Sequence, residues 1–347
     1  MNTPLQPEQQ SQSIRYQALC HWLDRLFNQQ ELQLSALNGD AGFRQYYRLS
    51  VHPHSYIVVD SPSDKINNTA VVEMTQAFSQ AGLLVPKIYH YEPEQGFLVI
   101  ADFGDTLLSQ VLNNDNFKGK YQQALMLLNQ VREVQSTPQW SLPEYDRTFL
   151  LTEMEIFRQW LLQTHLKLEL SEQEEDLLHN CFNTLADSAL AQPMVTVHRD
   201  FHCRNLISLT NGDLGVIDFQ DAVTGPITYD VVSLLRDCYV KWPAEQVELL
   251  VFEYWQQLTE QPQYANIDQQ QFFRWFDLMG MQRHLKAAGI FARLHHRDNK
   301  SGYLQDIPLT LSYLVDMANK YPQFSSLGHF LQHRVFPALA NTSKESE

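Results

Sequence analysis

Cysteine is scarce in this sequence, and the four cysteines are widely separated. They show no Cys-x-x-Cys spacing, and no Cys/His quartet surrounds His198 and His202. These absences argue against a disulfide-stapled domain and against a zinc motif of that kind. We expect reduced, mainly buried thiols at Cys20, Cys181, Cys203 and Cys238.

Long apolar runs and an excess of positive charge are also missing. No run approaches the roughly 20 residues of a membrane span, and the polar first ten residues lack the basic-then-apolar order of a signal peptide. With 25 Lys and Arg against 40 Asp and Glu, the net charge of −15 argues against nucleic-acid or anionic-membrane partners. We therefore expect a cytoplasmic, monomeric protein whose 347 residues suffice for two lobes.

Residues 197–221 carry the side chains that a phosphoryl-transfer site needs. A His-Arg-Asp run ending at Asp200, followed after four residues by Asn205, is the catalytic-loop pattern of kinases. Asp-Phe-Gln beginning at Asp218 stands where those enzymes carry Asp-Phe-Gly. Asp200 is therefore the candidate base, and His198 is expected to pack under the loop.

Two apolar, strand-like runs flank Asn211 and Gly212, a dipeptide that favours a hairpin because both positions tolerate positive φ. A turn centred there predicts a register in which Asn205 faces Asp218, with Cβ atoms about 5 Å apart. An amide oxygen and a carboxylate at that spacing suit Mg²⁺, which would complete its shell with phosphate oxygens and water. Asp200 would lie just ahead of this hairpin.

A second His-Arg-Asp ends at Asp298, but no Asn follows it at the required distance. It also has no strand before it and no hairpin after it, so Asp298 is not expected to be the base. The tripeptide alone therefore carries little information, and the hairpin context supports the site at Asp200.

Asp230 is expected in the first turn of a helix that opens with Gly225 and Pro226. Two interpretations stay open for it. Asp230 is either a carboxylate that favours the helix N-terminus or a residue that braces the catalytic loop.

The rest of the pattern predicts a disordered lead-in over 1–12, an N-lobe over 13–103 and a mainly helical C-lobe over 104–347. Expected N-lobe elements are a helix at 13–27, strands at 32–37, 45–51, 55–59, 87–91 and 96–101, and a helix from 68 to about 81. Expected C-lobe helices lie within 118–135, 148–162, 171–189, 244–260, 269–294 and 303–321. The loop 38–44 has the form of a phosphate-covering turn, and residues 102–105 form a natural hinge.

Several runs resemble the aminoglycoside-phosphotransferase and choline-kinase-like superfamily. They are Gly-Phe-Arg-Gln-Tyr-Tyr-Arg at 42–48, Ile-Val-Val-Asp-Ser-Pro at 57–62, Asp-Phe-Gln-Asp-Ala-Val at 218–223 and His-Arg-Asp at 296–298. Within that superfamily they look like the cell-wall-recycling sugar kinases that phosphorylate the anomeric hydroxyl of N-acetylmuramate and N-acetylglucosamine. The resemblance spans residue 39 to about 321.

The resemblance implies an α+β, two-lobed protein-kinase-like fold with ATP between a small β-rich N-lobe and a larger helical C-lobe. It implies Asp200 as the base and Asn205 and Asp218 as Mg²⁺ ligands. Adenine would lie near the hinge, and other residues would support the loop. These cofactor-binding and supporting residues are Ile100, Asp102, Phe103, His198, Asp221 and Asp230.

The third expected strand leads into Asp60, where kinases place the lysine that holds the α- and β-phosphates. A carboxylate cannot hold phosphate directly, so another cation has to substitute. Arg44, Arg48 and Lys65 stay open as candidates, and Arg44 is taken as the cofactor-binding residue.

The function implied is ATP-dependent phosphorylation of an amino sugar in peptidoglycan recycling. A kinase for aminoglycosides or another small-molecule hydroxyl is the alternative, followed by a pseudokinase because the lysine is missing. N-acetylmuramate is an anion and needs a local basic contact, for which the candidates are Arg147, Arg158, Arg283 and Arg293.

Overall fold

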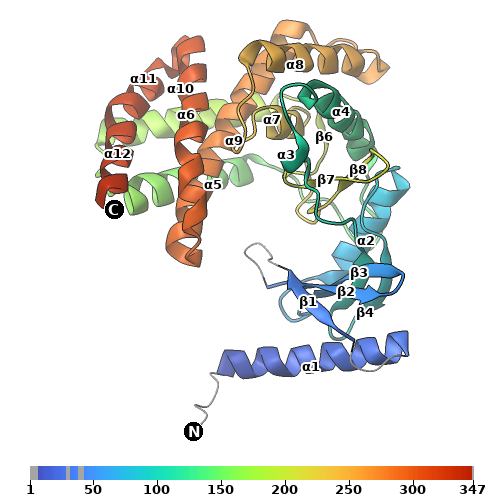
Figure 1. Ribbon diagram of the computed structural model, residues 1–347. Helices are drawn as coiled ribbons and strands as arrows, with labels where there is room; N and C mark the ends of the chain where they lie inside the picture. The colour runs from blue at the N-terminus through green and yellow to red at the C-terminus, as the bar shows by residue number, and fades with distance from the viewer. Residues whose placement is uncertain (1–6, 29–31, 38–42, 346–347) are drawn as a thin grey trace.

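The computed structural model describes residues 7–28, 32–37 and 43–345. A small lobe holding a five-stranded antiparallel sheet lies below a larger, mainly helical lobe (Figure 1). The predicted two-lobed α+β fold is confirmed. None of the helices in these ranges combines the length and the hydropathy of a membrane span.

The N-lobe sheet has the strand order β1-β2-β3-β5-β4. Its strands are β1 (Leu34–Leu37), β2 (Gln45–Val51), β3 (His54–Asp60), β4 (Ile88–Glu92) and β5 (Phe97–Ala101). Since side chains alternate along a strand, Leu49, Val58 and Val99 of the three inner strands are fully buried on one side. Helix α1 (Pro7–Phe27) packs Leu19 and Leu23 against that side and closes a separate N-lobe core.

Helix α1 starts earlier than the sequence pattern indicated. It begins at Pro7, six residues before the predicted start. Proline is compatible with this position because the backbone N–H groups of the first turn have no hydrogen-bond acceptor within the helix. The predicted phosphate-covering loop lies outside the described residues except for Phe43 and Arg44.

Helix α2 (Asn68–Gln80) links the N-lobe to the core of the C-lobe. The Asn67 side chain accepts the Ala70 N–H and caps the helix, as expected for this residue type. The buried side chains of Met74 and Phe78 belong to the C-lobe core and not to the core under the sheet. The two lobes therefore share buried apolar surface through α2.

The C-lobe is built around the long helix α9 (Gln269–Asp298), whose first turn is capped by the Asp268 side chain. The other α-helices are α3 (Leu108–Val111), α4 (Phe117–Glu133), α5 (Arg147–Ile156), α6 (Glu172–Leu190), α7 (Tyr229–Leu235), α8 (Ala244–Thr259), α10 (Ile307–Lys320), α11 (Ser325–Phe330) and α12 (Phe336–Glu345). Two short antiparallel sheets pair β6 (Met194–Val197) with β9 (Val223–Pro226) and β7 (Leu206–Ser208) with β8 (Leu214–Val216).

Three further expected elements differ from the observed ones. The helix expected at 148–162 is α5 followed by a π-helical segment, η1 (Phe157–His165). The helix expected at 303–321 begins as a 3₁₀ turn (Ser301–Asp306) before α10. Pro226 ends strand β9 and does not open a helix, because its neighbour Gly225 is paired with Val195 of β6.

Asp60, which replaces the expected lysine, has a structural partner. The Arg15 guanidinium of α1 donates to the Asp60 carboxylate and also to the Gln95 carbonyl at 2.8 Å. The Asp60 side chain is only 7% exposed, so few waters could replace this partner. Asp60 therefore attaches α1 to the sheet and is not a phosphate-holding residue.

Replacing Arg15 by Ala should lower the free energy of unfolding by about 1–2 kcal/mol, because it leaves a nearly buried carboxylate unpaired. The measurement is urea unfolding. Lys241→Ala breaks an exposed ion pair with Asp316 and serves as the control, with an expected loss below about 0.5 kcal/mol. Equal losses in the two variants would contradict the assigned role of Asp60.

Candidate active site

The catalytic hairpin β7–β8 forms, but one residue out of the predicted register. Ser208 pairs with Leu214, and the Ile217 N–H donates to the Asn205 carbonyl at 3.1 Å. Asn205 therefore lies opposite Ile217 and not opposite Asp218. The predicted register is wrong.

The error arises in the turn, which has three residues where two were expected. The Leu209 N–H donates to the Asp213 carbonyl at 2.9 Å, and Gly212 has φ = 90°. The Asn211 side-chain oxygen accepts the Asp213 N–H at 3.1 Å. A left-handed glycine in a three-residue loop is a common hairpin closure, and it shifts the pairing by one residue.

The Asp218 side chain reaches Asn205 because the backbone at Asp218 turns away from the extended conformation of the strand. Its φ is 65°, in the left-handed region that residues other than glycine rarely adopt, so the alternation of side chains is interrupted here. The Asp218 carboxylate accepts from the Asn205 amide nitrogen at 3.3 Å, and the same nitrogen donates to the Asp200 carbonyl at 3.0 Å. The structure thus brings together the three residues that the sequence pattern selected.

Asp230, in the first turn of α7, holds the catalytic loop from behind. Its carboxylate accepts the backbone N–H groups of His198 at 2.6 Å and of Arg199 at 3.0 Å. Arg199 has φ = 75°, a conformation that costs on the order of 1–3 kcal/mol and needs such support. Burial raises the pKa of Asp230 to about 7. Of the two interpretations left open, the geometry supports the bracing role.

His198 is fully buried under the loop. Its Nε2 lies 3.0 Å from the Ile217 carbonyl, and its Nδ1 accepts the Asp200 N–H at 3.3 Å. Burial lowers the pKa of His198 to about 4, so the ring is neutral at physiological pH. A neutral ring with both nitrogens engaged has a positioning role and does not carry protons.

Positive charge surrounds Asp200. Desolvation opposes ionisation of this carboxyl, but the nearby charges, led by that of Lys286, hold its pKa below the usual range. Lys286 and Arg199 both pair with Glu153 of α5, at 2.9 and 2.6 Å, and Glu153 is 5% exposed. Glu153 and Lys286 were not selected from the sequence. They belong to no motif, and only the packing of α5 against α9 brings them to the loop.

Asp218 and Asn205 form a donor set suited to a hard divalent cation. Desolvation and the charges of Asp200 and Asp221 raise the pKa of Asp218, so a cation beside it would relieve unfavourable electrostatics. The Asp221 carbonyl accepts from Arg199 at 3.3 Å, and its side chain is exposed. The protein would supply only two ligands, one amide and one carboxylate. This is the usual arrangement for Mg²⁺ that also binds phosphate oxygens.

The hinge residues Asp102 and Phe103 are held in place by contacts of their side chains. The Asp102 carboxylate accepts from Arg48 at 2.7 Å and from Ser55 at 2.6 Å. Phe103 packs on β8 so closely that a Cβ on Gly215 would lie 2.6 Å from its ring. Residues 102 and 103 directly follow half-buried Ile100 and Ala101 at the end of β5.

Among the described residues, two of the three candidate phosphate-binding cations, Arg44 and Lys65, have no ion-pair partner. Arg48 is held by Asp102 and Asp105, so it braces the hinge. Arg44 donates only weakly, to the Ser61 hydroxyl at 3.3 Å, and Lys65 lies 4.7 Å from the centre of the Phe43 ring.

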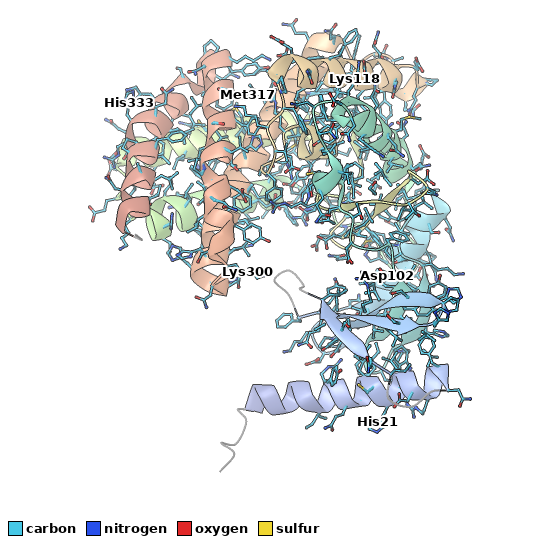
Figure 2. All side chains as sticks on the ribbon, in the orientation of Figure 1. His21, Asp102, Lys118, Lys300, Met317 and His333 are labelled. Atoms are coloured by element: carbon cyan, nitrogen blue, oxygen red, sulfur yellow. The ribbon has the colours of Figure 1, made fainter. Side chains whose placement is uncertain are left out.

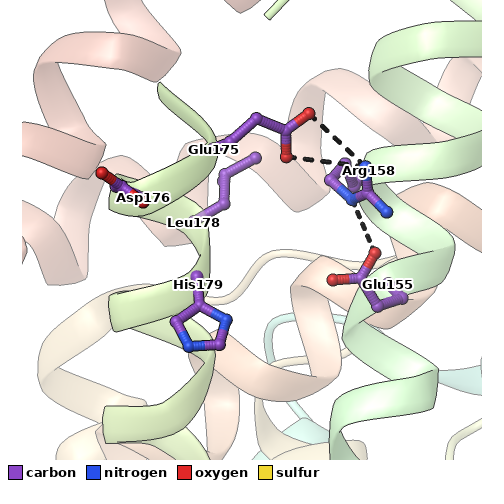
Figure 3. Close-up of a pocket in the computed structure, with 6 residues that line it drawn as sticks. All are labelled: Glu155, Arg158, Glu175, Asp176, Leu178 and His179. Atoms are coloured by element: carbon purple, nitrogen blue, oxygen red, sulfur yellow. Dashed lines mark hydrogen bonds and ion pairs between the residues drawn. The ribbon is translucent and has the colours of Figure 1, made fainter. Parts of the chain in front are cut away.

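A recess of about 330 Å³ lies elsewhere, between α6 and the junction of α5 with η1 (Figure 3). Its lining contains none of the residues of the catalytic loop, the hairpin or the hinge. Its one arginine, Arg158, is paired with Glu155 at 2.6 Å and with Glu175 at 3.4 Å. This recess is therefore separate from the catalytic loop.

Residues 33–266 match the model of the phosphotransferase enzyme family. The chain belongs to this family. It is 36% identical over 329 residues to an N-acetylmuramate/N-acetylglucosamine kinase of Pseudomonas putida, a match that covers 92% of this chain and 96% of the relative.

Two solved structures share the fold of this phosphotransferase at 14% identity each. An ethanolamine kinase of Plasmodium vivax superposes with a TM-score of 0.63, over 94% of this chain and 93% of the other. An ADP-bound aminoglycoside phosphotransferase gives a TM-score of 0.57, over 85% and 97%. The predicted protein-kinase-like architecture is thereby confirmed.

Replacing Asp230 by Ala should leave two N–H groups of the catalytic loop unpaired and release the strained Arg199 backbone. We expect kcat to fall about 100-fold, as for a catalytic group displaced by an ångström, and stability to fall by about 2–3 kcal/mol. Steady-state kinetics and urea unfolding measure the two effects. Asp187→Ala, at an exposed ion pair on α6, is the control. An unchanged kcat in Asp230→Ala would contradict the bracing role.

Proposed function

We propose that this protein transfers the γ-phosphate of ATP to the anomeric hydroxyl of N-acetylmuramate and N-acetylglucosamine. The observation that supports this most is the joining of Asp200, through its backbone carbonyl, to the Asn205–Asp218 pair in a chain 36% identical to a kinase of that name. The 1-phosphate products would feed nucleotide-sugar synthesis in peptidoglycan recycling, in the cytoplasm where ATP is available.

Asp200 is the group that orients the sugar hydroxyl and accepts its proton. No described residue donates a hydrogen bond to its carboxylate oxygens, so they are available to substrate. A low pKa makes Asp200 a weak base, but an anomeric hydroxyl is more acidic than an ordinary alcohol. Positioning and charge neutralisation would supply most of the rate enhancement.

The nucleotide would bind between the lobes, with its adenine against the backbone at 102–103. Arg44 is the cation assigned to its phosphates, with Lys65 as the remaining alternative. Asn205 and Asp218 would hold Mg²⁺, which when bound draws charge from the phosphate oxygens.

Two other functions lead to different outcomes in one assay. An aminoglycoside kinase would suit the net charge of −15, and a pseudokinase would explain the missing lysine. ATP consumption is measured with N-acetylmuramate, N-acetylglucosamine, kanamycin-like amines and choline. Turnover with the two sugars alone is expected, and turnover only with amines, or with nothing, would refute the proposal.

Replacing Asp200 by Asn should lower kcat by about 10²–10⁴-fold, because the amide cannot accept the proton. ATP binding, followed by calorimetry, should change little since Asp200 does not contact the adenine site. Asp298→Asn, in the second His-Arg-Asp, is the matched control and should keep full activity. Substantial turnover by Asp200→Asn would disprove its role as the base.

Arg293 is the candidate contact for the carboxylate of N-acetylmuramate. Of the four arginines considered, Arg147 and Arg158 are already in ion pairs. Arg283 is 8% exposed and lies over the Tyr229 ring. Arg293 is half-buried, has no ion-pair partner within the described ranges, and its Nε lacks a hydrogen-bond acceptor.

The position of Arg293 along α9 fits this role. It follows Lys286 by seven residues, so the two share a helix face about 10 Å apart, and Lys286 is already placed near Asp200. Desolvation and the Arg297 charge lower the pKa of Arg293, and a bound carboxylate would offset both.

Replacing Arg293 by Ala should raise KM for N-acetylmuramate about 10–100-fold, the value of one charge-assisted hydrogen bond. KM for N-acetylglucosamine, which has no carboxylate, should change little. Arg147→Ala, whose partner is Asp187 at the surface, controls for loss of positive charge. An equal effect on both sugars would contradict the assignment.

A further inference from the structure

Three imidazole rings converge away from the catalytic hairpin, at the ends of η1 and α9. His165 is the last residue of η1, and His295 and His296 lie in the last turn of α9. One ligand atom from each ring lies within 4.8 Å of the others. In the described part of the chain, no other group of three or more His, Cys, Asp or Glu side chains converges in this way.

The closest contact joins His165 Nδ1 to His296 Nε2 at 3.1 Å, across 131 residues of sequence. Zn–N bonds of about 2.0–2.1 Å in a tetrahedral shell place two nitrogens about 3.3 Å apart. This pair is therefore already close to the spacing of two metal ligands.

His295 supplies the third nitrogen. Its Nδ1 lies 3.0 Å from the Ser301 hydroxyl, which leaves Nε2 as its free ligand atom. A second-sphere hydrogen bond of this kind fixes the orientation of metal-binding histidines. His296 is exposed, so a fourth position would be open to water.

The backbone that presents His165 is unusual. A π-helical run is rare and is found preferentially at functional positions. Here its wider turns end at His165, against the last turn of α9. Helix α9 itself ends just beyond the cluster, at Asp298, and its C-cap residue Asn299 has φ = 55°. Lys300 lies at this end of the C-lobe, on the side toward the N-lobe sheet (Figure 2).

We propose that His165, His295 and His296 bind a transition-metal ion of the Zn²⁺ type and join η1 to the end of α9. Three nitrogen ligands select Zn²⁺, Co²⁺ or Ni²⁺ over Mg²⁺, which requires oxygen. The site is therefore chemically distinct from the Asn205–Asp218 pair. The positive charge of Lys167 acts on His296 and would oppose a bound cation. All three nitrogens are therefore needed to offset this repulsion.

The test is a Co²⁺ titration of untagged full-length protein, followed by visible absorption, with Zn²⁺ competition. One Co²⁺ per chain, displaced by Zn²⁺, is expected for the wild type. Zn²⁺ should also raise the melting temperature of the wild type. His165→Ala should show neither Co²⁺ binding nor this increase in melting temperature. Absence of stoichiometric binding in the wild type, or equal binding by His165→Ala, would refute the site.

A control and a folding check make each outcome decisive. His329→Ala/His333→Ala removes another close pair, with ring centroids 4.2 Å apart, and should bind Co²⁺ like the wild type. Loss of binding in that variant would show that the ion binds elsewhere. Circular dichroism verifies that each variant is folded. Because the readout is metal binding, the result does not depend on the sugar-kinase proposal.

Discussion

The catalytic loop depends on one buried carboxylate. Asp230 accepts two consecutive backbone N–H groups, from His198 and Arg199, at a point where Arg199 has a left-handed backbone. Without these bonds the turn would lose the partners that offset its strain. The same two hydrogen bonds fix the direction of the chain at Asp200. They therefore also determine its position beside Asn205.

Contacts from the N-lobe hold the other side of the catalytic segment. The Phe78 ring of α2 stacks on Phe219 with centroids 4.8 Å apart, immediately after Asp218. The Val216 N–H of β8 donates to the Leu84 carbonyl at 2.7 Å. The residues assigned to Mg²⁺ are therefore attached both to the C-lobe loop and to the lobe assigned to the nucleotide.

Some charged groups of the C-lobe are engaged in structural ion pairs, and others remain available to bind substrate. Glu153 engages Arg199 and Lys286 in a buried cluster behind Asp200, where unpaired charges would be costly. In the part of the chain that the structure describes, no group donates a hydrogen bond to the Asp200 carboxylate oxygens, and Arg293, farther along α9, has no ion-pair partner. The arrangement fits a substrate that has a hydroxyl group to activate and an acidic group to neutralise.

The sequence by itself determined features that depend on neighbouring residues. Strand β2 has the predicted bounds, and α8 ends within one residue of prediction, because the hydrophobic period is set by residues a few positions apart. The spacing of Asp200, Asn205 and Asp218 also selected residues that the fold brings together. Tertiary structure decided how they meet. The hairpin register depends on the backbone conformation of Gly212. The approach of Asp218 to Asn205 depends on the φ of Asp218.

Contacts between distant segments carried no signal in the sequence. Glu153 reaches the catalytic loop only because α5 packs on α9, and Asp60 gains its role only when α1 places Arg15 beside it. The histidines that meet at the ends of η1 and α9 are separated by 131 residues. Such partners are determined by the packing of whole elements, because the free energy that joins them comes from buried surface spread along each helix and not from a local motif.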